Sequence, residues 1–133
     1  MNTGAAFKKL DTWQQAMQLV EEIYKATAQF PREELYGLTS QLRRAAVSVP
    51  SNVAEGYCRR STKAYANHVS IALGSHAEVE TCLELSCRLG FLSKADRDRF
   101  EEQTSSVGRL LSGLHRSLED KLRVTFPPKE DRS

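Results

Sequence analysis

The sequence predicts an all-α protein that forms an antiparallel, up-down four-helix bundle. Apolar residues recur at steps of three and four along four long segments, which is the spacing of one face of a helix. No segment alternates apolar and polar residues as a half-buried strand would. Short connections join the four segments, and short connections place neighbouring helices antiparallel. We assign residues 1–126 to a single bundle domain and residues 127–133 to a polar C-terminal tail.

The first helix is expected over residues 12–28. Its apolar face consists of Trp13, Ala16, Met17, Val20, Ile23 and Tyr24. Asp11 is the predicted N-cap, and Gln14 completes a capping-box pattern with it. The helix should end before Pro31, because a proline disfavours helical geometry in the residue that precedes it.

The second helix is expected over residues 32–58, with Pro50 inside it. A proline within a helix removes one backbone hydrogen bond, and its ring pushes away the carbonyl of the residue four positions earlier, here Ala46. We therefore expect this helix to be kinked or broken near Pro50.

The third and fourth helices are expected over residues 61–88 and 93–123. Ser61 is the predicted N-cap of the third helix, and Gly90 should end it. Ser93 should cap the fourth helix, with Asp96 at its third position. The apolar stripe of the fourth helix consists of Phe100, Val107, Leu111, Leu114, Leu118 and Leu122.

The composition is that of a soluble domain. Charged residues make up 27% and hydrophobic residues 40% of 133 residues. No apolar run approaches the roughly 18 residues of a membrane-spanning helix, and residues 1–10 lack the apolar stretch of a signal peptide. Three cysteines without metal-site spacing indicate reduced thiols. We expect a cytoplasmic protein without membrane contact.

The sequence contains no pattern typical of catalysis or metal binding. Neither Glu55 nor Glu78 is followed three residues later by the histidine that a di-iron bundle requires. No cysteine is accompanied by an adjacent base, and no glycine-rich loop could cradle a phosphate. We expect no enzymatic activity, no metal and no cofactor.

The third helix carries a second seam opposite its main apolar face. The seam follows alternating steps of four and three through Ile71, Ser75, Glu78, Cys82, Leu85 and Leu89. A helix in an isolated four-helix bundle needs only one broad apolar face, so a second face predicts self-association. The residues expected at the interface are Ile71, Cys82, Leu85 and Leu89. The alternative is that a thick bundle buries this helix more deeply than its neighbours.

A polar stripe follows the second helix through Gln41, Arg44, Ser48, Asn52, Glu55 and Arg59. Such a stripe can be a solvated helix edge. It can also fix the register of two helices or two subunits through a polar network, for which we select Arg44, Asn52, Glu55 and Glu78.

The sequence around this stripe resembles a known family. Residues 41–56, QLRRAAVSVPSNVAEG, resemble the signature of the four-helix-bundle proteins encoded by intervening sequences in bacterial 23S rRNA genes, also called the S23 ribosomal protein family. Further matching segments are residues 7–13, 24–31, 36–39, 60–63 and 72–78. The resemblance covers about residues 7–120.

This resemblance implies an all-helical bundle that assembles as a ring-shaped homopentamer, and it implies no enzymatic activity. The chain is also similar, more distantly, to the accessory protein of diversity-generating retroelements. That protein has the same bundle and ring, and its partners are a reverse transcriptase and nucleic acid.

Basic residues concentrate around the second helix and the turn that follows it. Residues 31–67 contain six basic and three acidic residues, whereas residues 68–92 contain one basic and three acidic residues. The turn of residues 59–63 precedes a helix N-terminus, which favours anions. The residues we expect to contact phosphate are Arg43, Arg44, Arg59, Arg60, Ser61 and Lys63. Alternatively, Arg59 and Arg60 only offset the dipole of the second helix.

A second basic row repeats every seven residues on the fourth helix, at Arg109, Arg116 and Arg123. Acidic residues border it, so the row is typical of a solvated surface, although a ring of five copies would sum its field. We therefore expect a non-catalytic, homo-oligomeric module that binds RNA or DNA through phosphate contacts. The alternative is an adaptor or scaffold that binds another protein and no nucleic acid.

Overall fold

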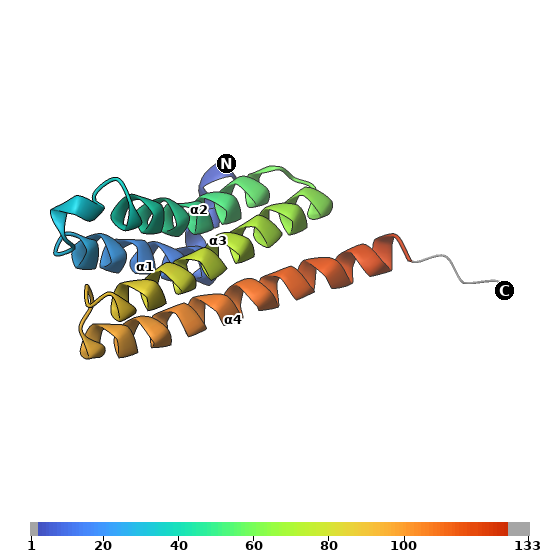
Figure 1. The fold of residues 1–133 in the computed structure, drawn as a ribbon. Helices are drawn as coiled ribbons and strands as arrows, with labels where there is room; N and C mark the ends of the chain where they lie inside the picture. The colour runs from blue at the N-terminus through green and yellow to red at the C-terminus, as the bar shows by residue number, and fades with distance from the viewer. Residues whose placement is uncertain (1–2, 128–133) are drawn as a thin grey trace.

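The computed structural model describes residues 3–127 of the chain, and within them it contains four α-helices and no strand. The α-helices are α1 (Asp11–Thr27), α2 (Leu38–Cys58), α3 (Thr62–Arg88) and α4 (Lys94–Thr125). Two short 3-10 helices, η1 (Thr3–Lys9) and η2 (Arg32–Glu34), precede α1 and α2. The all-α bundle is thus confirmed (Figure 1). The predicted polar tail lies outside the described residues, except for Pro127.

The helices pack around the bundle in chain order. Each of α2 and α4 contacts both α1 and α3, and within the described residues neither diagonal pair of α-helices is in contact. The main core is formed by the inward faces of all four helices, including Ile23, Leu42, Val79 and Phe100, each at most 1% exposed.

α4 is much longer than α1, and this difference shapes one end of the molecule. α4 has 32 residues and α1 has 17, or about 48 Å and 26 Å at 1.5 Å per residue. Two contacts tie α1 to the first half of α4: Gln15 accepts a hydrogen bond from Ser106, and Glu22 binds Arg99. The second half of α4 extends past α1 and packs along α3 (Figure 1). A separate small core forms there around Ala66, Val69 and Leu118.

The caps of α3 and α4 are confirmed. Ser61 Oγ accepts a hydrogen bond from the Ala64 amide at 3.2 Å, and Ser93 Oγ accepts one from the Asp96 amide at 3.1 Å. Gly90 adopts a φ of 81°, the left-handed conformation that commonly ends a helix.

The predicted cap of α1 is wrong. Asp11 is the first residue of the helix itself, and its carboxylate makes no capping bond; Leu10 occupies the N-cap position. Gln14 instead donates a hydrogen bond to the Lys8 carbonyl at 2.7 Å. The preceding 3-10 helix thus supplies the carbonyl that the Gln14 side chain binds, in place of the predicted capping-box contact.

The second predicted helix also differs from the structure. A turn through Gly37 separates η2 from α2, so residues 32–58 do not form one continuous helix. α2 then runs without a break through Pro50, and the predicted kink is not confirmed. Val49 and Val53, at 2% and 0% exposure, hold the apolar face in the core on both sides of the lost hydrogen bond. No helix among the described residues is long and apolar enough to span a bilayer.

Candidate functional site

The basic turn between α2 and α3 is exposed. Arg59 is the C-cap residue of α2, and Arg60 adopts a φ of 57°, which lets the chain reverse direction before α3 begins. Ser61 and Lys63 follow, and the Ser61 hydroxyl is engaged by the Ala64 amide. The turn therefore presents Arg59, Arg60 and Lys63 at one end of the bundle.

Arg43 and Arg44 do not belong to this surface, although the sequence grouped them with it. They lie some 16 residues before Arg59 on the same helix, or about 24 Å away along its axis. Arg43 is half-buried and packs against the end of α1: its Nε donates to Thr27 Oγ1 at 2.7 Å, and its guanidinium carbon lies 4.5 Å from the centroid of the Tyr24 ring. Arg43 thus holds α1 to α2, while Arg44 is exposed.

The structure brings together two basic groups that the sequence separates by 60 residues. Lys63 at the start of α3 and Arg123 near the end of α4 line one hollow of about 560 Å³, together with Glu119, Leu122 and Phe126. Arg123 also binds Asp120 Oδ1 at 2.6 Å. Antiparallel packing of α3 on α4 causes this meeting, and neither sequence pattern alone could indicate it.

Polar side chains cross-link α2 and α3 on the outer face of the bundle. Gln41 donates to Glu78 at 3.2 Å, the Ser48 and Ser75 hydroxyls lie 2.8 Å apart, and Asn52 Oδ1 lies 3.0 Å from His68 Nδ1. Asn52 and Glu78, two residues of the predicted network, thus contact the neighbouring helix of this pair.

Two members of the predicted network are not part of it. Arg44 and Glu55 are exposed, and no hydrogen bond or ion pair joins their side chains to other described residues. At 100° per residue, both fall to one side of Gln41, Ser48 and Asn52, the three residues of α2 that contact α3 here. His68 was missed because an isolated histidine gives no sequence signal.

The second seam of α3 remains largely exposed. Ile71, Leu85 and Leu89 are 54%, 45% and 53% exposed, which is unusual for aliphatic residues arranged along one side of a helix. Cys82, also assigned to this seam, is wrong as a surface residue: it is 3% exposed and lies in the main core. At 100° per residue it lies about 60° from the buried Val79, at the edge of the buried face of α3.

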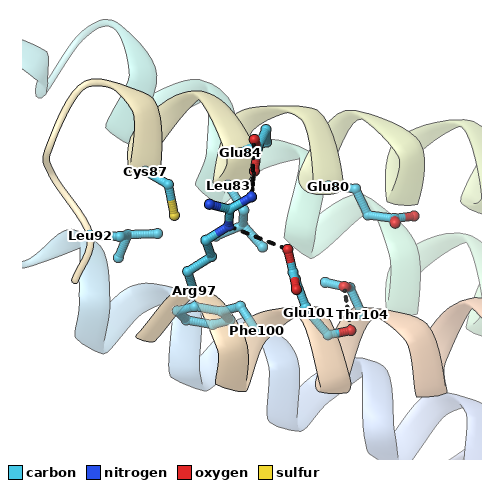
Figure 2. Close-up of a pocket in the computed structure, with 9 residues that line it drawn as sticks. All are labelled: Glu80, Leu83, Glu84, Cys87, Leu92, Arg97, Phe100, Glu101 and Thr104. Carbon is cyan, nitrogen blue, oxygen red and sulfur yellow. Dashed lines mark hydrogen bonds and ion pairs between the residues drawn. The ribbon is translucent and has the colours of Figure 1, made fainter. Parts of the chain in front are cut away.

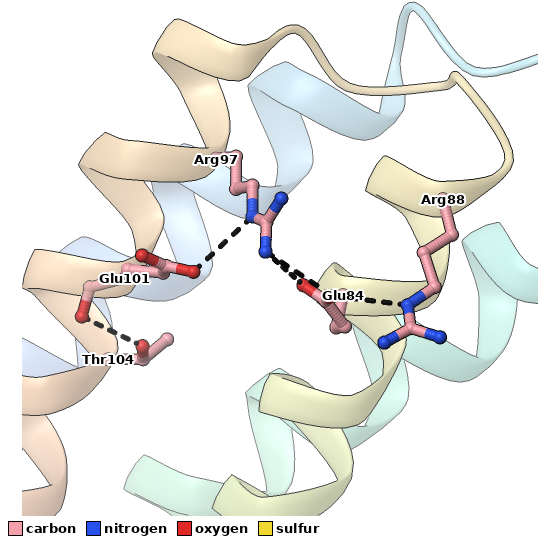
Figure 3. A network of polar contacts seen from close by, with 5 residues as sticks. All are labelled: Glu84, Arg88, Arg97, Glu101 and Thr104. Atoms are coloured by element: carbon pink, nitrogen blue, oxygen red, sulfur yellow. Dashed lines mark hydrogen bonds and ion pairs between the residues drawn. The ribbon is translucent and has the colours of Figure 1, made fainter.

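Figure 2 shows a small hollow of about 210 Å³ between α3 and α4, near the turn that joins them. Its charged groups bind one another. Arg97 bridges Glu84 and Glu101 at 3.2 Å and 3.3 Å, and Arg88 also binds Glu84 at 3.2 Å (Figure 3). This end of the α3–α4 groove is therefore acidic and internally paired.

The thiols near this hollow are not activated. Burial raises the pKa of Cys87, and burial together with the Glu78 carboxylate raises the pKa of Cys82. A nucleophilic cysteine needs a lowered pKa instead. Within residues 3–127 no group of three histidine, cysteine or carboxylate side chains has an arrangement that could hold a metal ion.

Comparisons with known proteins agree with this fold. A search of curated proteins found no match. The chain is similar to a crystal structure of a protein of unknown function from the S23 ribosomal protein family of Bacteroides thetaiotaomicron, with a TM-score of 0.72 and 18% identity. The similarity covers 79% of this chain and 95% of that one. Residues 8–113 match the family model of the 23S rRNA-intervening sequence protein. The chain therefore belongs to the family of 23S rRNA-intervening sequence proteins.

Proposed function

We propose that this protein is a non-catalytic, homo-oligomeric module that binds nucleic acid through phosphate contacts. The observation that carries the proposal is the meeting of the basic turn with the end of α4. Lys63 and Arg123 line one hollow there, with Arg59 and Arg60 in the same turn as Lys63. Cationic side chains gathered at one end of a molecule attract a polyanion without reading its bases.

Self-association is supported by the exposed side of α3. Ile71, Leu85 and Leu89 expose about half of their surface in a single chain. Covering this strip with a second copy would bury apolar surface at roughly 25 cal/mol per Å². The homopentameric ring is the assembly that the family resemblance implies. A ring would repeat the basic end five times and raise affinity by avidity.

The proposal is tested by fluorescence anisotropy on nuclease-treated protein, with a labelled RNA hairpin and a labelled DNA duplex at several salt concentrations. The variant combines Arg59→Ala, Arg60→Ala and Lys63→Ala. If these three residues each contact a phosphate, the slope of log affinity against log salt should fall in magnitude by about two to three units for the duplex.

A matched control removes three positive charges from the opposite end of the bundle, with Lys25→Ala, Arg32→Ala and Arg88→Ala. This control should bind nearly as well as the unmodified protein. Absence of binding by the unmodified protein at low salt would overturn the proposal. A single protein captured after nuclease treatment, without any affinity for nucleic acid, would identify the chain as an adaptor instead.

A further inference from the structure

A third hollow, of about 460 Å³, lies in the α3–α4 groove between the basic end and the acidic hollow of Figure 2. Arg109 and Arg116 of α4 line it, with Ser112 between them in the sequence and His76 of α3. From the sequence alone, this basic row is typical of a solvated surface. The residues around these two arginines in the fold indicate a binding surface instead.

Arg109 and Arg116 differ from the other arginines of their own helix. Arg97, Arg99 and Arg123 each bind a carboxylate, at distances between 2.6 Å and 3.3 Å. Arg109 and Arg116 are exposed, and no carboxylate of residues 3–127 forms an ion pair with either of them. Glu80 is the acidic residue that lines the hollow, and it lies 3.4 Å from His76 Nε2. The hollow thus contains two unneutralised guanidinium groups.

Two glycines of α4 keep the hollow open. A Cβ on Gly108 would lie 3.3 Å from His76 Nε2, so this glycine allows the imidazole to pack against α4. A Cβ on Gly113 would meet nothing within 4 Å, so packing inside the chain does not require a glycine there. A glycine inside a helix costs about 1 kcal/mol relative to alanine. The effect of Gly113 is to leave free space between the two arginines.

His76 forms a polar wall of the hollow. Its side chain is 3% exposed, and its Nε2 lies 2.8 Å from the Thr104 carbonyl oxygen, which fixes the ring. Its Nδ1 is buried without a hydrogen-bond partner among the described residues. His76 therefore closes one side of the hollow with a fixed ring, and the positive charge that faces the hollow comes from Arg109 and Arg116.

We infer that this groove binds the phosphodiester backbone of a nucleic acid, with Arg109 and Arg116 on phosphate oxygens. The inference rests on the proposed function and locates a second contact surface for it. The two arginines are seven residues apart, or about 10 Å along the helix, and at 100° per residue they lie on the same side of α4. Arg123 lies two turns beyond Arg116 on α4 and lines the neighbouring hollow together with Lys63 of α3, so the backbone runs from this groove to the basic end.

The test compares three variants by anisotropy with the same labelled DNA duplex and RNA hairpin. Arg109→Ala combined with Arg116→Ala should weaken binding by at least tenfold at low salt and lower the salt slope for the duplex by about two units. Arg32→Ala combined with Arg88→Ala removes the same charge from the acidic end and should leave binding nearly unchanged. Gly113→Gln adds a side chain to the hollow without changing the charge, so it should weaken binding while the melting temperature stays equal or rises.

The outcomes separate this inference from the proposed function. If the unmodified protein binds and only the variant at Arg59, Arg60 and Lys63 is impaired, the groove does not contact nucleic acid and the inference is wrong. Undiminished binding by Gly113→Gln would likewise exclude the groove as the contact surface. If the unmodified protein does not bind either probe, both proposals are wrong.

Discussion

Gly56 of α2 lies directly against His68 of α3: a Cβ on Gly56 would stand 2.7 Å from the His68 Cβ and 3.0 Å from a ring carbon of Tyr65. The two helices can approach this closely only because residue 56 has no side chain. The approach also brings His68 within hydrogen-bonding distance of Asn52, one turn earlier on α2.

Gly56→Ala should therefore destabilise the protein, by about 1–3 kcal/mol, although alanine favours a helix. The clash involves the Cβ of His68 and the backbone of Tyr65, which cannot rotate away. Urea unfolding followed by circular dichroism measures the change. Gly113→Ala is the matched control, since its added methyl group meets nothing within 4 Å, and it should stabilise by up to about 1 kcal/mol. Equal effects of the two substitutions would contradict the close approach.

Arg43→Ala should lower stability more than it lowers nucleic-acid affinity. The substitution removes the hydrogen bonds to Thr27 Oγ1 and the Tyr24 carbonyl and the contact with the Tyr24 ring, which together are worth about 1–3 kcal/mol. Arg44→Ala, on the neighbouring exposed residue, should change the free energy of unfolding by less than about 0.5 kcal/mol. Urea unfolding and anisotropy on both variants check this. If Arg43→Ala lost affinity for nucleic acid and kept its stability, the main role of Arg43 would be to bind nucleic acid and not to hold α1 to α2.

Leu85→Glu and Leu89→Glu should each reduce the assembled mass measured by sedimentation velocity. A carboxylate in an apolar interface must be desolvated without a partner, which costs several kcal/mol. Val124→Glu introduces the same charge at a side chain that is 84% exposed on α4, away from the seam, and should leave the mass unchanged. If both leucine variants keep the parental mass, the exposed side of α3 is not a subunit interface.

The Tyr65→Phe variant should lose less stability at high pH than the unmodified protein. Burial, with a smaller contribution from Tyr57, raises the pKa of Tyr65 from 10.0 to about 12. The unfolded chain therefore releases this proton at a lower pH than the folded one, so the contribution of Tyr65 to stability is constant below pH 10 and falls as the pH rises towards 12. Urea unfolding at neutral and alkaline pH should show a smaller alkaline loss for Tyr65→Phe than for the unmodified protein.

The same substitution should not destabilise the protein at neutral pH. The Tyr65 hydroxyl is buried without a hydrogen-bond partner among the described residues, and an unpaired buried hydroxyl costs about 1–3 kcal/mol. Tyr65→Phe keeps the edge-to-face contact with Tyr57, whose ring centroid lies 5.9 Å away. A large loss of stability at neutral pH would reveal a hydrogen bond at this hydroxyl.

Local patterns predicted the elements of the fold well, and they failed where another element intervenes. Ser61, Ser93 and Gly90 act within a turn of themselves, so their roles could be read from the sequence. Asp11 is not the cap because α1 follows the preceding 3-10 helix closely and begins at Asp11 itself, with Leu10 at the N-cap position. Cys82 is not an exposed seam residue because its position lies at the edge between the seam and the buried face of α3, and the fold buries it.

The candidate site could be predicted only in part, for the same reason. The basic turn of residues 59–63 is a local feature and was found from charge alone. Arg43 contacts Tyr24 and Thr27 because α2 packs against α1. No spacing of residues within α2 predicts these contacts.

The sequence by itself determined four helices, the caps of α3 and α4 and the short connections that make a bundle, because helical periodicity and capping depend on neighbours within one turn. Only the tertiary structure decided which charged side chains meet. Antiparallel packing of α3 on α4 brings Lys63 to Arg123, pairs Arg97 with Glu84 and leaves Arg109 and Arg116 in an open groove. Side chains from distant parts of the chain approach one another only when the helix register is fixed, and the buried contacts of the core set that register.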